Sequence, residues 1–302
     1  TDSEIVEHEP AGPSRPVTLE GVLHVDRVAA LRCHCPSILQ RWAARPRHWP
    51  SPVIVRKVVS LGAFLTPVGF KDSQYKDIEW RICFNTGEAE LVNNLNGTQA
   101  HVHVMLKMIL KDVLRPRKKE VTSYVIKNIV LWQAERNPQN SFDTRSFFHW
   151  LQNGLRELKN AIVTQQLSYY MIPERNLMAA CGLQDKQQRQ WVAAISEMMD
   201  DGPWVIMRLP RIRQAILASP EPMLWFIKKR MELEMLFLEG LNRHDTVQNE
   251  NGIVDESDSE CDAILQDILR RRGELVTEVA QRMLEEGSSV TNMSAITWRL
   301  LM

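Results

Sequence analysis

The sequence predicts an α+β fold in which a few short strands come first and a long series of helices follows. In segments 17–32 and 77–85 apolar residues alternate with other residues, and this period of two is typical of strands. From residue 100 onward apolar residues recur at helical spacing, as in segments 100–114 and 144–164. Strands followed by helices, without an internal repeat, indicate a small sheet with a helical lobe behind it.

The first part of the chain holds the predicted strands. Segment 17–32 is expected to form a strand or a hairpin interrupted near Gly21, and segments 63–70 and 77–85 are expected to form two more strands. Between them, segment 53–62 predicts a helix whose last residue, a glycine, is its C-terminal cap. The apolar residues of the last strand are expected to share one face: Ile78, Trp80, Ile82 and Phe84.

The rest of the chain is predicted to be helical. The expected helices lie in segments 87–95, 100–114, 121–135, 144–164, 186–199, 209–218, 223–241 and 263–286. The domain organisation follows from this order of elements. It comprises a sheet-bearing core at 1–85, a helical lobe at 86–219 and a helical extension at 220–302, in which 242–262 is an acidic linker.

Composition limits the class of protein. The chain has 302 residues, 44% of them hydrophobic, but no run of eighteen apolar residues and no N-terminal signal-peptide pattern. Five scattered cysteines favour reduced thiols. We therefore expect a cytoplasmic protein without a membrane partner, with a nuclear location as the alternative. Because the chain does not begin with Met, an upstream piece is also expected.

Charge is balanced overall but unevenly distributed. Residues 242–302 hold 12 acidic and 6 basic side chains, whereas the rest of the chain holds 25 acidic and 31 basic ones. A mildly basic body with an acidic tail is compatible with binding to polyanions, and an ordinary solvated surface gives the same count.

Asp26 is an unusual residue in its segment, because the predicted strand around it is apolar on both faces. A carboxylate in such a strand is costly to bury unless a metal, a cation or hydrogen bonds hold it. The alternative is a half-exposed strand residue beside Arg27 or Arg32.

Six motifs in a fixed order resemble the Mab-21 (male-abnormal-twenty-one) family, which includes cyclic GMP-AMP synthase and related nucleic-acid-sensing receptors. They are VDRVAAL around Asp26, HWP at 48–50, EWRICFN at 79–85, LKMIL at 106–110, SYVIKN at 123–128 and YYMIPERNL at 169–177. The resemblance spans roughly residues 12–216. It implies part of a nucleotidyltransferase-fold sheet, a helical lobe of the helix-hairpin-helix (H2TH-like) kind and nucleotide bound in the cleft between them, with the helical extension lying outside it.

The same resemblance gives Asp26 a role. Nucleotidyl transfer uses two divalent metals, and oxygen ligands suit Mg²⁺ or Mn²⁺. In the family three acids hold these metals, and Asp26, with Trp49 and Pro50 downstream, resembles the third of them. The other two, from a Gly-Ser turn followed by Glu-x-Asp, have no counterpart in the chain. The chain is therefore either a fragment or a non-catalytic member of the family.

Four more residues resemble nucleotide-binding positions of the family. Arg81 corresponds to the arginine that lines base and phosphates, and Lys107 to the lysine that faces the triphosphate. Ser123 and Tyr124 correspond to a pair in which the tyrosine stacks on a base and the serine reaches a phosphate. Cys83 stands where the active synthase has serine. The alternative interpretations are that Lys107 is a solvated surface lysine and that Tyr124 is a half-buried aromatic residue of a helix.

Further partners are weaker expectations. The basic turn with Arg115, Arg117, Lys118 and Lys119 is compatible with phosphate contacts to double-stranded nucleic acid, but a solvated turn between helices is the favoured interpretation. Zinc is not expected, because the segment that matches the zinc-bearing insertion of the synthase has two histidines and no cysteine. Apolar residues of the C-terminal helices predict a protein partner or a core.

Two functional hypotheses follow. In the first, the chain is part of a receptor-type nucleotidyltransferase that senses nucleic acid in innate immunity and joins ATP and GTP into a cyclic dinucleotide. In the second, it is a catalytically inactive relative that acts as a protein-interaction scaffold, or as a developmental regulator that acts through partners. Whether the chain is an enzyme depends on the two acids that the sequence lacks.

Overall fold

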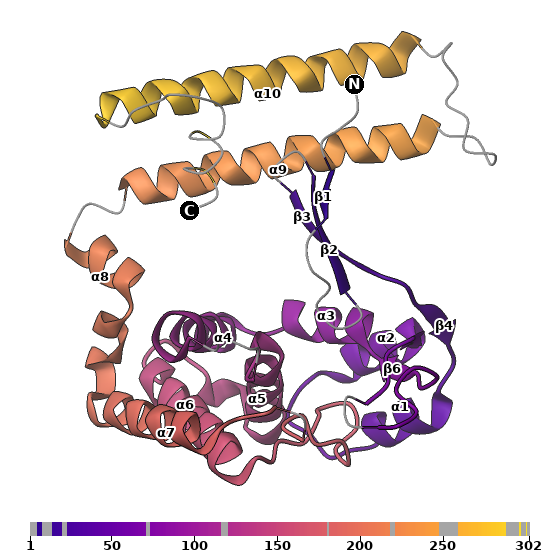
Figure 1. Cartoon of the computed structure of the whole chain (residues 1–302), viewed down its shortest axis with the longest axis vertical. Helices are drawn as coiled ribbons and strands as arrows, with labels where there is room; N and C mark the ends of the chain where they lie inside the picture. Colours follow the sequence, from indigo (N-terminus) through magenta and orange to yellow (C-terminus); the bar gives the residue numbers. More distant parts are fainter. Residues whose placement is uncertain are drawn as a thin grey trace. The chain divides into compact units, whose positions relative to one another are not determined.

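The computed structural model describes residues 5–7, 14–19, 23–70, 73–115, 120–179, 181–217, 221–247, 259–287, 296 and 300 (Figure 1). The chain divides into two compact units. Unit 1 combines Thr1–Val28 with Ala215–Met302, and unit 2 is the continuous segment Ala29–Gln214. Within the described residues, no helix is both long enough and apolar enough to cross a lipid bilayer.

Unit 1 contains an antiparallel sheet of three strands, in the order β1 (Ile5–Glu7), β2 (Ser14–Leu19) and β3 (Leu23–Val28). Strands β2 and β3 form the hairpin that the sequence predicts around Gly21, and Asp26 lies opposite Pro16 in its register. The prediction of one strand up to residue 32 is wrong. The strand ends at Val28, and the next strand belongs to the sheet of unit 2.

The rest of unit 1 is a pair of long helices, α9 (Glu221–Val247) and α10 (Ser259–Glu285), which run side by side (Figure 1). Both confirm predicted helices. Their shared core also contains Ile296 and Leu300 from beyond α10. The buried residues of the two helices are Phe226, Leu233, Leu236, Phe237, Ile268, Leu275, Val279 and Met283.

Unit 2 begins with a second small antiparallel sheet, in the order β4 (Leu31–Cys33), β5 (Ala63–Thr66) and β6 (Arg81–Cys83). Two helices, α1 (Pro36–Ala43) and α2 (Pro52–Leu61), lie between the first two strands. Helix α2 ends as predicted, because Gly62 follows it with a positive φ of 70° that favours glycine.

The predicted strand over 77–85 is confirmed only at its centre. Thr66 pairs with Arg81, and the ladder between β5 and β6 stops there. The next residue of β5 would be Pro67, which has no backbone N–H to donate. Ile78 and Trp80 therefore precede the strand and are exposed, rather than sharing a buried face with Phe84.

Helices form the remainder of unit 2, and they confirm the predicted helical lobe. A short π-helical turn, Leu110–Leu114, continues α4. The helices are α3 (Asn85–Asn93), α4 (Gly97–Ile109), α5 (Ser123–Arg136), α6 (Phe147–Thr164), α7 (Asp185–Asp200) and α8 (Pro210–Leu217). Helices α4 and α6 pack closely at Gly154, where a Cβ would lie 2.6 Å from a methyl group of Leu106.

A buried ionic cluster ties the start of unit 2 to α5. Glu135 accepts hydrogen bonds from a guanidinium nitrogen of Arg45 at 2.9 Å and from the hydroxyl of Tyr170 at 2.7 Å. A second guanidinium, that of Arg47, lies 3.9 Å from the same carboxylate. The guanidinium of Arg45 also stacks on the rings of Trp132 and Tyr170. This cluster joins three segments that lie far apart in the sequence.

Candidate functional site

The centre of the candidate site is Glu88, whose residue is only 1% exposed although it is a carboxylate. It lies in the first turn of α3, directly after β6 and the buried Phe84. Two groups from α5 donate to it: the hydroxyl of Tyr124 at 2.9 Å and the ammonium group of Lys127 at 2.6 Å. Lys127 also lies over the ring of Tyr124, at 4.4 Å from its centroid. The carboxylate thus fixes both side chains.

Tyr124 is consequently held in a neutral, donating state. Burial, and then the charge of Glu88, raises the pKa of its phenol well above the usual range. Its ring packs against the fully buried Tyr169, with 5.8 Å between centroids. The guanidinium of Arg175 lies over the Tyr169 ring at 5.2 Å. The rings of Tyr124 and Tyr169 form an aromatic wall, and the Arg175 guanidinium lies against it.

Arg81 joins that cation in a shallow hollow of about 340 Å³ beside β6. Burial, and then the neighbouring charge of Arg175, lowers the pKa of the Arg81 guanidinium. The acid at the hollow, Glu79, already accepts from the Ser73 hydroxyl at 2.5 Å and from the backbone N–H of Phe70 at 2.8 Å. Two guanidinium groups that face one hollow favour a bound anion.

A larger hollow, of about 960 Å³, opens at the N-terminus of α5. Lys107 and Ser123 both line it. Thr122 precedes the helix without a side-chain cap, and its backbone oxygen accepts from the N–H of Val125 at 3.0 Å, so the Thr122 side chain does not occupy the N–H groups of Ser123 and Tyr124. The N-terminus of a helix attracts anions. The remaining charged residues that line this hollow are Lys111, Asp112, Arg115 and Arg211.

His103 lies near Lys107, one of the basic residues that line this hollow. Burial first, and then the charges of Lys107 and Lys127, lower the pKa of the His103 imidazole to about 4. The imidazole is therefore neutral at neutral pH and adds no third charge to those of Lys107 and Lys127.

This shift predicts that acid weakens the folded state through His103. The unfolded imidazole has a pKa near 6.5, against about 4 in the folded chain, so the unfolded state binds the proton first as pH falls. The contribution of His103 to stability is therefore present above pH 6.5 and declines as pH falls towards 4. Urea unfolding of the wild type and His103→Gln from pH 7 to pH 4 measures it, and we expect a shallower decline in the variant. Parallel curves would contradict the assignment.

The structure brings some of the predicted residues together and leaves others apart. Lys107, Ser123 and Arg115 line one hollow, and Arg81 lines another. Tyr124 turns inward to Glu88 rather than lining either hollow. Of the predicted nucleic-acid contacts, Arg115 is exposed and its guanidinium donates to the backbone oxygen of Asp112 at 2.8 Å. The other three, Arg117, Lys118 and Lys119, lie outside the described residues.

Asp26 cannot be assigned to this site. Its backbone lies in β3 of unit 1, and its side chain is not among those that the structure describes. The other predicted residues belong to unit 2. Among the described residues, no group of three His, Cys, Asp or Glu side chains is arranged to hold a metal ion.

Sequence reasoning missed several charged members of the site, among them Glu88, Lys127, Arg175 and Arg211. Lys127 and Arg175 stand inside the SYVIKN and YYMIPERNL motifs, so the motifs themselves carried a signal. Glu88 reads as an ordinary surface residue of a short helix, and only its long-range contacts with α5 show that it is buried.

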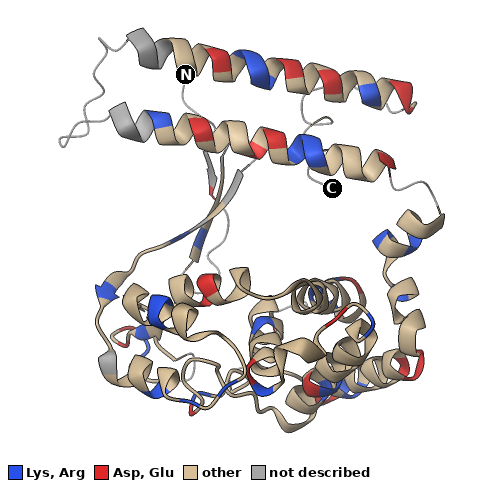
Figure 2. Ribbon diagram, turned by 180° about the vertical axis from the view of Figure 1, so that it is seen from behind, with Lys and Arg blue, Asp and Glu red and all other residues tan. Residues whose placement is uncertain are grey.

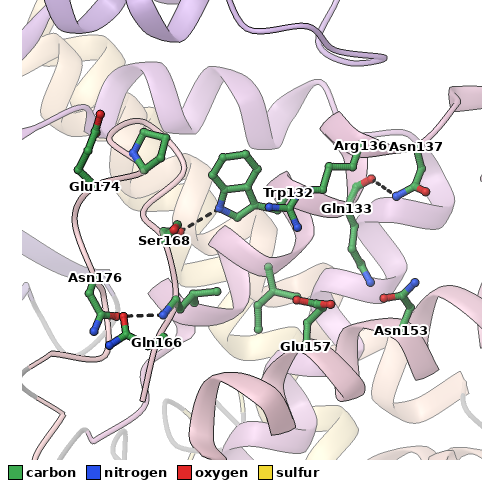
Figure 3. A pocket seen from close by; sticks show the side chains of 13 residues that line it. Trp132, Gln133, Arg136, Asn137, Asn153, Glu157, Gln166, Ser168, Glu174 and Asn176 are labelled. Atoms are coloured by element: carbon green, nitrogen blue, oxygen red, sulfur yellow. Dashed lines mark hydrogen bonds between the residues drawn. The ribbon is translucent and has the colours of Figure 1, made fainter. Parts of the chain in front are cut away.

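A third hollow, of about 450 Å³, lies between α5, α6 and the loop before Asn176 (Figure 3). Trp132 forms part of its wall, and the indole nitrogen donates to the backbone oxygen of Ser168 at 2.9 Å. Asn153 and Glu157 project towards it from α6 (Figure 3). None of the residues predicted from the sequence lines this hollow, so it is distinct from the basic one.

Comparison with known sequences finds two consecutive matches in the chain, over residues 5–94 and 99–197. The sequence model of the Mab-21 protein nucleotidyltransferase domain matches residues 5–94, and that of the Mab-21 protein HhH/H2TH-like domain matches residues 99–197. Together they cover more than half of the chain. A cyclic GMP-AMP synthase-like receptor of Aethina tumida is 24% identical over 155 residues, which are 51% of this chain and 37% of the relative. The match thus spans little more than a third of that relative's length.

Proposed function

Because this chain belongs to the Mab-21 family, we propose that its basic hollow at Lys107 and Ser123 binds the phosphate groups of a nucleotide. The observation that carries the proposal is the hollow at the N-terminus of α5, which is lined by four cationic residues and one acid, Asp112. Lysine and arginine donate charge-assisted hydrogen bonds to phosphate, and the hydroxyl of Ser123 adds a neutral donor.

The base and sugar would lie towards Arg81 and the aromatic wall of Tyr124. Glu88 holds Tyr124 in place, and Lys127 and Tyr169 already pack against its ring, so Tyr124 supports the wall of the site and is not itself a stacking surface. Arg81 and Arg175 provide further positive charge for the same ligand. We propose a nucleoside triphosphate such as ATP or GTP, in keeping with the family's nucleotidyltransferase domain.

The test of this proposal is the affinity for nucleotide. Removing one charge-assisted phosphate contact costs about 1.5–3 kcal/mol, so Lys107→Ala is expected to weaken GTP binding by roughly 10–100-fold. Calorimetric titration of the full chain measures this, with Lys186→Ala, an exposed lysine of α7, as the matched control. Equal affinity in Lys107→Ala and wild type, or no binding by the folded wild type, would refute the proposal.

The second part of the proposal concerns catalysis at the nucleotide-binding site. In a cyclic dinucleotide synthase, two nucleotides are joined with release of pyrophosphate on sensing of a nucleic acid, and Mg²⁺ or Mn²⁺ supplies charge stabilisation. Asp26 is proposed as one metal ligand, and Arg115 with its basic neighbours as nucleic-acid contacts. An assay with ATP, GTP, Mn²⁺ and double-stranded DNA, comparing wild type with Asp26→Asn, tests this part. Binding without product would favour a non-catalytic nucleotide-binding scaffold, the second hypothesis from the sequence.

A further inference from the structure

The outer face of α9 carries an apolar stripe that nothing in the described part of the chain covers. Six residues between 38 and 64% exposed form it: Leu224, Ile227, Met231, Met235, Leu238 and Leu241. They recur at intervals of three and four residues, which places them on one side of the helix. The opposite side of α9, with Phe226, Leu233 and Phe237, is already buried against α10.

The stripe is symmetric about the middle of its own helix. Leu224 and Leu241 lie equally far from the midpoint between Glu232 and Leu233, and so do Ile227 and Leu238. Met231 and Met235 form the central pair to within half a residue. Such a palindrome is the pattern that two copies of one helix need in order to pack antiparallel about a two-fold axis.

Charge is not palindromic, because it changes from basic to acidic near the middle of α9. Lys228 and Arg230 lie in the N-terminal half, and the acids Glu232, Glu234 and Glu239 follow (Figure 2). Lys229 instead pairs with Glu278 of α10 at 2.7 Å. An antiparallel pair sets basic against acidic residues, whereas a parallel pair sets like charges side by side.

We propose that the occupant of this face is the α9 helix of a second copy of this chain, packed antiparallel about a two-fold axis. Leu224 then lies opposite the partner's Leu241, Ile227 opposite the partner's Leu238 and Met231 opposite the partner's Met235. Arg230 lies near the partner's Glu234. Within one chain Arg230 already bonds Glu234 at 2.7 Å, so the two pairs form a symmetric four-charge cluster at the centre of the dimer.

The helix pair also provides room for this packing. A hollow of about 900 Å³ between α9 and α10 is lined by Met231, Met235 and Leu238 of the stripe, by Leu275, and by charged residues that include Arg271 and Glu274. Methionine is flexible enough to fill such a groove against a second helix. Two α9–α10 pairs then form a four-helix arrangement, and this surface lies beyond both family matches, which end at residue 197.

The first test is the mass of the full chain in solution. Sedimentation equilibrium is expected to give a concentration-dependent dimer of 34.9 kDa chains. Met231→Glu/Met235→Glu introduces four charges at the dimer centre and is expected to weaken the dimer at least about 100-fold. The control, Leu269→Glu/Leu284→Glu, alters two exposed leucines of α10 and should leave the dimer intact. A chain that stays monomeric, or a dimer that both variants change equally, overturns the proposal.

The second test probes the charge cluster at the dimer centre and does not depend on apolar substitutions. Arg230→Glu and Glu234→Arg each place like charges together in a homodimer, so each variant alone is expected to be largely monomeric. Mixed in equal amounts, they restore opposite charges across the antiparallel pair, and the dimer should return. Mixing does not restore the Arg230–Glu234 pair within one helix, so recovery of the dimer reports on contacts between two chains. Failure of the mixture to dimerise overturns the antiparallel arrangement.

Discussion

Glu135→Gln is expected to lower the free energy of unfolding by about 3–5 kcal/mol, the cost of removing one partner from a buried ion pair. Glu135 is 4% exposed, and it balances the guanidinium groups of Arg45 and Arg47. Glutamine keeps the size of the side chain and removes the charge, so both cations stay buried without a counter-ion. The hydroxyl of Tyr170 also loses a charged acceptor.

Urea unfolding followed by tryptophan emission measures this loss. Part of the signal reports on the cluster, because its guanidinium groups stack on Trp132 and Trp42, two of the nine tryptophans of the chain. The matched control is Glu197→Gln, which removes an exposed carboxylate that pairs with Arg208 at 3.3 Å. We expect a change below about 1 kcal/mol for the control. Similar losses in both variants would show that the cluster contributes no more than a surface ion pair.

Glu88→Gln is expected to cost about 2–4 kcal/mol, because Lys127 and Tyr124 both lose a buried charged acceptor. The ammonium group of Lys127 is then largely buried without its counter-charge, beside the Tyr124 ring and a neutral amide. We therefore expect that Lys127→Met, added to Glu88→Gln, recovers part of the loss, since an apolar side chain of similar length needs no counter-charge.

A double-mutant cycle with the two single variants and the double variant gives the coupling free energy directly. Glu90→Gln is the control on the same helix, where the carboxylate pairs at 2.7 Å with Lys57, an exposed side chain. A double variant as unstable as the sum of the single variants would mean that Glu88 and Lys127 are not coupled. The bond at 2.6 Å would then contribute little to stability.

The helices were predictable from the sequence, because burial repeats with the helical period along them. Along α6, Leu151, Leu155, Leu158 and Ile162 are all completely buried. The strands were less predictable, because short strands depend on their partners. Segment 77–85 alternates over nine residues, but its neighbour β5 ends before Pro67, and three residues of the segment pair.

The site was predictable in part. The order of the motifs predicted that Lys107 and Ser123 both bind nucleotide, and the two residues line the same hollow. No local pattern distinguishes Glu88 from the exposed acids of other helices, because its burial depends on side chains 36 and 39 residues away. Arg211 comes from α8 and meets the others only through the fold of the lobe.

The division of the chain into units has a consequence for folding during translation. Unit 2 is one uninterrupted segment, whereas unit 1 needs residues from both sides of it. At about 5–20 residues per second, a ribosome takes roughly 10–40 s to make the intervening segment. Helix α9 therefore emerges after unit 2 has had time to fold, and its apolar stripe becomes available to a second nascent chain only after that body is complete.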